Sequence, residues 1–257
     1  MQDLKVTLVQ TSQAWEDKMA NLKNYEEQLA RIKEPTDLIL LPEMFHTSFS
    51  MNTMELAEKM NGKGVQWLKK QAAKYKSAFA TSLIIEEEGK YFNRMVFVKP
   101  DGTISTYDKR KLFGMAKEDQ HFSPGLKNTI VTYKDWKILL QVCYDLRFPE
   151  LCRNKMNDSG ETQYDLLLYV ANWPEKRSMH WKALLPARAI ENQCFVAAVN
   201  RVGVDGNNHA YSGDSMVINP LGTITAAKSY SDVAITQTLK ASELSETHKK
   251  MPFLKDA

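Results

Sequence analysis

The sequence predicts a layered α/β or α+β fold, in which helices cover one or more sheets from the outside. Short apolar segments of strand length recur from residue 4 to about residue 238, and segments with helical spacing separate several of them. No composition break or long linker divides the 257 residues. We therefore expect a single domain over residues 1–257, with a polar, peripheral segment from about residue 240.

The first half of the chain alternates strands and helices. Residues 4–9 are rich in β-formers, and residues 37–41 form a continuous apolar run, which is typical of a strand buried on both faces. Between them, apolar residues at helical spacing predict a helix from residue 15 to about residue 33, which Pro35 ends. The other elements expected here are a helix at 62–76, a hairpin with strands at 78–86 and 90–99, and a strand at 103–107.

The second half continues this pattern. Residues 137–143 and 166–170 are apolar runs that predict buried strands, and a helix is expected at about 178–192. Further strands are expected at 195–200, 215–218, 223–226 and 233–238, with a hairpin turn at 220–222. Periodicity alone does not predict how many sheets these strands form.

Charge and cysteine content exclude several classes of protein. Lys and Arg total 34 and Asp and Glu total 31, so the net charge of +3 indicates neither a nucleic-acid nor an acidic-membrane partner. No apolar run approaches the length of a membrane span, and the N-terminus has no signal-peptide layout. Three cysteines argue against a disulfide framework and for a reducing compartment, which we expect to be the cytoplasm.

Three residues with reactive side chains lie at the ends of expected strands. Glu43 and Lys109 follow such strands, and Cys143 ends one. Open α/β sheets gather ligands at the carboxyl ends of their strands, so these side chains could meet in a cleft. Taken singly, each has an ordinary interpretation, as a solvated Glu, a surface Lys and a small buried apolar Cys. Cys152 and Cys194 keep that last interpretation.

The motifs around these residues change the balance. Residues 41–45 (LPEMF), 107–113 (YDKRKLF) and 143–150 (CYDLRFPE), in this order, resemble the nitrilase superfamily, whose Glu–Lys–Cys triad follows the same order. Supporting matches lie at 91–93, 123–125, 171–174, 188–192, 213–215 and 220–222, so that the resemblance runs from about residue 4 to 240. Within the superfamily the chain is most similar to bacterial omega-amidases, which hydrolyse the terminal amide of 2-oxo acids such as 2-oxoglutaramate.

The resemblance to the nitrilase superfamily also implies the fold, the assembly and the type of substrate. The fold would be a four-layer α-β-β-α sandwich, assembled as a homodimer, and the substrate a small amide. No metal or organic cofactor is expected, and the five His show no metal-ligand spacing. One departure from the family pattern is Lys111, where many members have His, and the loop at 114–118 also differs from the common version.

The triad suggests how the residues would act. A thiol needs a base to become a nucleophile, and a carboxylate can serve when burial or neighbouring charge brings its pKa toward neutrality. We expect Cys143 to be the nucleophile and Glu43 the base. Lys109 and the backbone N–H of Tyr144 would stabilise the oxyanion. Glu118 matches a second superfamily Glu, nine positions after Lys109, and would orient Lys109.

The substrate pocket is predicted from neighbours of the triad. Three aromatic residues could form its wall: Phe45, Tyr144 and Trp173. Arg177 is the candidate for binding a substrate carboxylate, because a guanidinium binds a carboxylate in a fork. Arg147 and Arg188 are expected to form structural ion pairs instead.

Other functions stay open on the sequence alone. The triad does not separate an amidase from a nitrilase, a carbamoylase or an amidine hydrolase. A non-catalytic binding module on the same fold is a further alternative, against which the retained triad and Glu118 argue. A Cys–His protease is disfavoured because no His lies in a motif that pairs it with Cys143.

Overall fold

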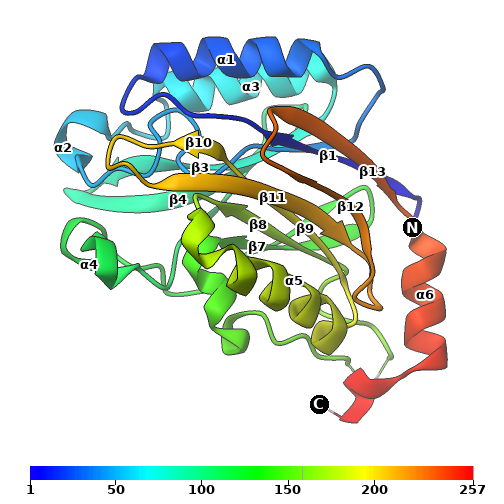
Figure 1. Cartoon of the computed structure of the whole chain (residues 1–257). Coiled ribbons are helices and arrows are strands. Elements are labelled where there is room, and N and C mark those ends of the chain that lie inside the picture. The colour runs from blue at the N-terminus through cyan, green and yellow to red at the C-terminus, as the bar shows by residue number, and fades with distance from the viewer. Residues whose placement is uncertain (158, 257) are drawn as a thin grey trace.

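The computed structural model describes residues 1–157 and 159–256. Two sheets pack face to face with helices on their outer sides (Figure 1). The first sheet has the strand order β13-β1-β2-β3-β4-β5, in which β1, β2 and β3 run parallel. Its strands are β1 (Leu4–Gln10), β2 (Leu38–Leu40), β3 (Ala78–Glu87), β4 (Lys90–Val98), β5 (Ile104–Asp108) and β13 (Val233–Leu239).

The second sheet has the order β10-β11-β9-β8-β7-β6, and β12 pairs with β11 at its side. Strands β7, β8 and β9 are parallel, so both sheets have a parallel centre and antiparallel flanks. The strands are β6 (Ile130–Tyr133), β7 (Trp136–Val142), β8 (Leu166–Ala171), β9 (Phe195–Asn200), β10 (Val202–Val204), β11 (Ala210–Ile218) and β12 (Ile224–Ser229).

Helices complete the two outer layers. Figure 1 shows α1 (Lys18–Ala30) and α3 (Lys63–Tyr75) on one side of the paired sheets and α5 (Ser178–Asn192) on the other. Two short helices, α2 (Thr53–Leu56) and α4 (Glu118–His121), lie in loops, and α6 (Ala241–Lys250) lies at one edge. The predicted α-β-β-α sandwich is therefore confirmed.

Strand periodicity explains why the core has two compartments. Leu38 and Leu40 of β2 belong to the cluster between the sheets, whereas Ile39 belongs to the cluster under α1 and α3. Successive side chains of a strand point to opposite faces, so a sheet buried on both faces needs a continuous apolar run. Leu22 of α1 and Leu68 of α3 cover the outer face. The run at 37–41 is therefore a strand between two apolar layers.

The structure differs from the predicted elements at several places. Helix α1 begins at Lys18 rather than residue 15, because the Asp17 side chain caps it by accepting the Ala20 N–H. Strand β11 begins at Ala210 rather than residue 215, because the positive φ angles of Gly213 and Asp214 form a bulge that hides the alternation. Helix α6 fills part of the segment expected to be peripheral, and its Leu244 packs on the core.

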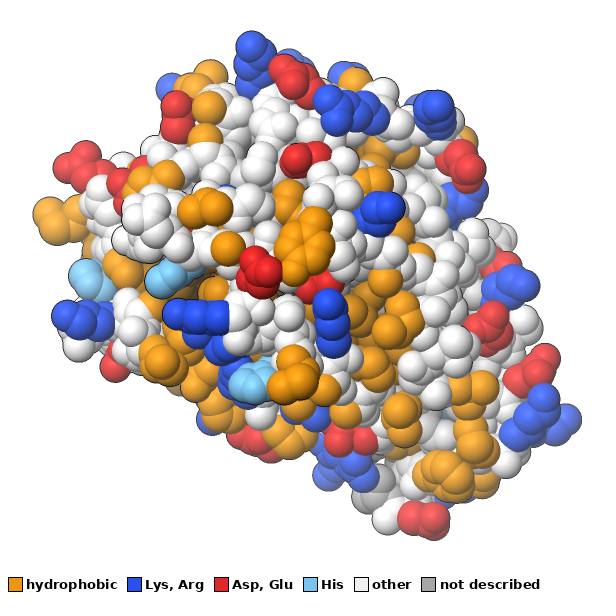
Figure 2. Space-filling model, viewed as in Figure 1, with side chains coloured by type: hydrophobic (Ala, Val, Ile, Leu, Met, Phe, Trp, Pro, Cys, Tyr) orange, Lys and Arg blue, Asp and Glu red, His pale blue; other side chains and the backbone are white. Residues whose placement is uncertain are grey.

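The surface agrees with the charge balance. Figure 2 shows blue and red side chains interspersed over the visible face, without a large patch of either sign. Among the described residues, no helix has both the length and the apolar character needed to cross a bilayer. Cys152 and Cys194 are buried in the main core cluster, as predicted for apolar packing residues.

Candidate active site

The loops that carry the predicted site residues leave one end of both sheets. Glu43 follows β2 and Lys109 follows β5 in the first sheet. Cys143 follows β7 and Asn172 follows β8 in the second. Because these four strands point the same way, their carboxyl ends meet at one edge of the sandwich. The sheet-to-sheet packing therefore brings together side chains that are far apart in sequence.

Lys109 lies between two carboxylates. Its Nζ is 2.9 Å from Glu43 Oε1 and 2.9 Å from Glu118 Oε2, and all three side chains are at most 1% exposed. Burial alone would lower the pKa of Lys109, but the charges of Glu118 and Glu43 outweigh burial and hold the pKa above its ordinary value. The ammonium is thus a fixed positive charge inside the protein.

Two further donors hold the carboxylates in place. The Asn93 side-chain amide donates to Glu43 Oε1 at 2.8 Å and to Glu118 Oε1 at 3.0 Å. The backbone N–H of Phe113 donates to Glu118 Oε2 at 2.6 Å. Glu118 is fully buried, so the unusual sequence of the loop before it does not displace it. Asn93 lies in a motif that carried the family resemblance, although the sequence assigned it no role.

Cys143 begins a 3₁₀ turn, Cys143–Arg147, directly after β7. Its φ angle of 44° lies in the left-handed region, a conformation that costs a non-glycine residue about 1–3 kcal/mol. The Sγ atom is 3.9 Å from the backbone oxygen of Asn172. Burial raises the pKa of the Cys143 thiol well above its ordinary value, and the Glu43 carboxylate adds to this while Lys109 opposes it. The resting group is therefore a thiol beside a carboxylate.

Asn172 joins the two sheets at this point. Its backbone N–H donates to Glu43 Oε2 at 2.8 Å, and its side-chain amide donates to the Glu43 backbone oxygen at 2.6 Å. The Glu43 carboxylate is therefore held by Lys109, Asn93 and Asn172 together. Sequence reasoning noted the motif at 171–174 but missed this role.

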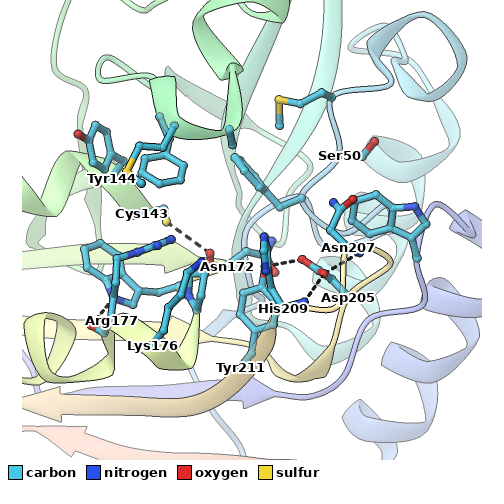
Figure 3. Close-up of a pocket in the computed structure, with 18 of the residues that line it drawn as sticks. Ser50, Cys143, Tyr144, Asn172, Lys176, Arg177, Asp205, Asn207, His209 and Tyr211 are labelled. Carbon is cyan, nitrogen blue, oxygen red and sulfur yellow. Dashed lines mark hydrogen bonds between the residues drawn. The ribbon is translucent and has the colours of Figure 1, made fainter.

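Lys109, Cys143 and Asn172 line a cavity of about 550 Å³, the size range of small-molecule sites, whereas Glu43 and Glu118 are buried behind it. Four of the residues predicted for the site line it together with Cys143: Lys109, Tyr144, Trp173 and Arg177. Figure 3 shows Cys143 beside Asn172, with Lys176 and Arg177 on one side of the cavity and Asp205 and Asn207 on the other. Asp205 holds its side of the wall by accepting from the Tyr211 hydroxyl at 2.8 Å and from the backbone N–H groups of Asn207 and His209.

The prediction that Phe45 lines the pocket is wrong. Phe45 is fully buried in the cluster under α1 and α3, with its ring centroid 5.5 Å from those of Tyr25 and Trp67. The positive φ of Met44 turns the chain, and the Phe45 N–H then bonds to the backbone of β3. Phe49 lines the cavity instead, four residues further along.

The prediction for Arg147 is also wrong. Arg147 lines the cavity, and its guanidinium lies 4.7 Å from the Trp173 ring centroid and 3.1 Å from a nitrogen of His180. In the described part of the chain, no carboxylate forms an ion pair with Arg147, Lys176 or Arg177, so these three cations, here called the cationic wall, line the cavity without an acidic partner. Arg188, by contrast, forms the expected structural ion pair, with Glu191 at 2.8 Å.

The Lys111 departure does not disturb the site. Lys111 Nζ lies 4.6 Å from the Phe148 ring centroid and 3.5 Å from Glu150, away from the Lys109 cluster. Across residues 1–157 and 159–256, no three His, Cys, Asp or Glu side chains are grouped so that they could hold a metal ion.

Comparisons with known proteins identify similar sequences and a family. A model of the carbon-nitrogen hydrolase family matches residues 5–249. The chain is 45% identical to omega-amidase YafV of Escherichia coli strain K12, over 100% of this chain and 98% of that protein. It is 31% identical to 2-oxoglutaramate amidase of Bacillus subtilis strain 168, over 92% of this chain and 90% of that protein.

A solved structure is similar over its whole length. XC1258 from Xanthomonas campestris is described as a CN-hydrolase superfamily protein with an arsenic adduct in its active site. It superposes with a TM-score of 0.97 at 43% identity, covering 100% of this chain and 98% of that one. With the family model matching most of the sequence, the chain belongs to the carbon-nitrogen hydrolase family, as the resemblance to the nitrilase superfamily predicted.

Proposed function

We propose that this protein hydrolyses the terminal carboxamide of a small 2-oxo acid, such as 2-oxoglutaramate, and releases ammonia through a cysteine thioester. The observation that carries the proposal is the buried Glu43–Lys109–Glu118 cluster beside Cys143, on a cavity whose wall bears three cations without acidic partners. The names of the two curated relatives support the same activity.

In the first half-reaction the Cys143 sulfur attacks the amide carbon. The raised pKa of the thiol means that its proton must leave as the C–S bond forms, and the neighbouring Glu43 carboxylate accepts it. The tetrahedral intermediate then collapses, the C–N bond breaks, and protonated Glu43 gives its proton to the departing amine. The products are a thioester on Cys143 and ammonia.

In the second half-reaction water replaces ammonia. Glu43 takes a proton from the water, whose oxygen attacks the thioester carbon. The C–S bond breaks, the proton returns to the sulfur, and the product leaves as a carboxylic acid. One carboxylate therefore serves twice as a base and twice as an acid, which requires that it hold a constant position. Its bonds to Lys109, Asn93 and Asn172 hold it.

The oxyanion of both intermediates needs fixed donors. Lys109 lines the cavity beside Cys143 and carries a positive charge that two buried carboxylates stabilise. The first N–H groups of a helical turn have no partners within the turn, so the backbone N–H of Tyr144 is the second donor. One donor of this kind contributes about 3 kcal/mol of transition-state stabilisation. Glu118 acts through Lys109, to which both of its oxygens are bonded.

The cationic wall would bind the substrate carboxylate. Arg177 lies over the Phe113 ring, with 5.0 Å from its guanidinium carbon to the ring centroid, and Arg147 lies over Trp173. These aromatic faces hold two guanidinium groups in place without neutralising them. A 2-oxo acid would pair its carboxylate with this wall while its far amide reaches Cys143.

Ammonia release tests the proposal. We expect faster turnover, as kcat/KM, for 2-oxoglutaramate and 2-oxosuccinamate than for neutral amides, nitriles and carbamoyl compounds of similar size. Arg177→Ala should raise KM for the anionic amide about tenfold or more and change KM for a neutral amide little. Arg31→Ala, at the end of α1, is the matched control. Equal rates on neutral and anionic amides would contradict the substrate class, and a preference for nitriles would contradict the reaction.

Three further predictions belong to this proposal. We infer that residues 1–257 act as one domain, that the protein is a homodimer and that it works in the cytoplasm. Sedimentation of the purified protein tests the assembly, and fractionation of the cells that make it tests the location.

A further inference from the structure

Asp145 is a buried carboxylate that the proposed reaction does not use. It lies two residues after Cys143 in the 3₁₀ turn, is fully buried and does not line the cavity. The sequence contains it in the motif at 143–150, without a role. Its position and contacts indicate what it does.

The carboxylate accepts three hydrogen bonds. Oδ2 accepts from the Val142 backbone N–H at 3.0 Å and from the Tyr107 hydroxyl at 2.8 Å. Oδ1 accepts from the Lys111 backbone N–H at 2.9 Å. A buried carboxylate needs several donors to offset the loss of water. One of these three donors lies in β7 of the second sheet, and the other two lie in β5 of the first sheet and in the loop that follows it.

The donors flank the two reactive residues. Tyr107 precedes Lys109 by two residues and Lys111 follows it by two, so Asp145 is hydrogen-bonded to the chain on both sides of Lys109. Val142 directly precedes Cys143, so the same carboxylate holds the entry to the nucleophile's turn. The two ends of this link are the loop after β5 and the loop after β7.

We propose that Asp145 is a positioning residue, which fixes the Cys143 turn against the Lys109 loop so that sulfur and ammonium face the same carbonyl group. The inference rests on the proposed function and adds a residue to it. The left-handed φ of Cys143 explains why its turn needs these hydrogen bonds, because a strained conformation persists only where its surroundings hold it.

The electrostatics of Asp145 support the inference. Burial raises its pKa to about 6, although its three donors and Lys109 act in the opposite direction. Above that pH the ionised carboxylate is less favourable in the folded protein than in water, so it is a poor device for stability alone. Buried groups with shifted pKa values cluster at functional sites.

Asp145→Asn tests this positioning role. The asparagine keeps the shape of the side chain, but its N–H₂ group replaces one carboxylate oxygen and cannot accept the hydrogen bonds that this oxygen accepts. Asp165→Asn is the matched control. Asp165 is a buried carboxylate at the opposite end of the second sheet, where it accepts from the Lys137 N–H at 2.9 Å and from the Thr162 hydroxyl at 3.2 Å. Each variant is compared with the wild type by circular dichroism, by kcat and KM for ammonia release, and by the rate at which iodoacetamide alkylates Cys143.

We expect Asp145→Asn to lower kcat about 100-fold while KM changes less than about threefold, since small misplacements of reacting groups have effects of this size. Alkylation of Cys143 should slow about tenfold or more in protein that remains folded. Asp165→Asn should lower the melting temperature and leave both rates unchanged. Wild-type kcat and alkylation in folded Asp145→Asn would overturn the inference, and so would equal losses of both rates in the two variants.

A second variant covers the case in which Asp145→Asn does not fold. Tyr107→Phe removes one donor and keeps the carboxylate, and we expect about a tenfold lower kcat with an unchanged KM. An unchanged kcat would overturn the inference. Alkylation by iodoacetamide does not involve hydrolysis of an amide. It therefore still tests the positioning role if the wild type releases no ammonia from any omega-amide. That result would contradict only the proposed function.

Discussion

The two ends of strands β2 and β8 bear similar polar residues in different arrangements. At their starts, Asp37 accepts from the Lys5 N–H at 2.8 Å and Asp165 from the Lys137 N–H at 2.9 Å, each within its own sheet. At their ends, Glu43 and Asn172 bond to each other from one sheet to the other. At the starts of these strands the backbone bonds link neighbouring strands of one sheet, and the side-chain pair that joins the sheets, Asp37–Lys134, is partly exposed, whereas at their ends buried bonds join the two sheets.

The two ends of the strands also differ in how far water reaches their charged groups. At the starting end, Asp37 pairs with Lys134, whose side chain is 47% exposed, so water screens the charges. At the other end, Lys109 and both of its carboxylates are almost completely buried beside a thiol and a cavity. A carboxylate after a strand becomes chemically useful only where other loops converge on it and exclude water.

The largest contrast is expected between two cysteines. Cys143→Ala at the site should lower kcat by about 10⁴-fold or more with the fold intact, because no other group can form the thioester. Cys194→Ala, in the fully buried core, should cost about 1 kcal/mol of stability and leave kcat unchanged. Ammonia release and thermal unfolding measure the two effects. Substantial amidase activity in Cys143→Ala would remove it as the nucleophile.

The next contrast is between Lys109 at the site and Lys134 at the opposite end of the sheets. Lys109→Ala should lower kcat about 10³-fold, because it removes an oxyanion donor and releases Glu43. It should also cost about 3–5 kcal/mol of stability, because two buried carboxylates lose their cation. Lys134→Ala removes a partly exposed pair and should cost less than about 1 kcal/mol, with kcat unchanged. An unchanged kcat in folded Lys109→Ala would place the oxyanion elsewhere.

Much of this comparison was visible in the sequence, and its failures have physical causes. The apolar runs predicted the central strands, since a strand between two apolar layers must be apolar throughout. The ordered motifs predicted which acid, amine and thiol meet. Phe45 and Arg147 were misassigned because the direction of a side chain after a strand depends on local φ angles and on loops distant in sequence. Asn172 and Asp145 act through tertiary hydrogen bonds, which no periodicity records.

The state of the thiol offers a further test. Because burial and Glu43 raise the pKa of Cys143, thiolate stays a minor form near neutral pH. Its alkylation by iodoacetamide should therefore rise about tenfold per pH unit from about pH 6.5 to 8.5, without levelling off. A lowered pKa would instead give a plateau within this range. Cys143→Ala supplies the background rate from the other two cysteines, and a plateau below pH 8 would indicate a preformed thiolate.

The smallest effects should come from the hydrogen bonds themselves. Asn172→Ala keeps the backbone N–H that holds Glu43 Oε2 but removes the amide that holds the Glu43 backbone oxygen. We expect kcat to fall about tenfold with KM unchanged, because Glu43 stays beside the sulfur with less restraint. Asp37→Asn disturbs a similar bond at the other end of β2, so it should lower stability by about 1 kcal/mol and leave kcat unchanged. If Asn172→Ala and Asp37→Asn lowered kcat equally, the bonds at the two ends of β2 would not differ in function. The loss of kcat would then reflect the rigidity of β2 as a whole. A fall in kcat confined to Asn172→Ala would instead show that the bond between the sheets places the base.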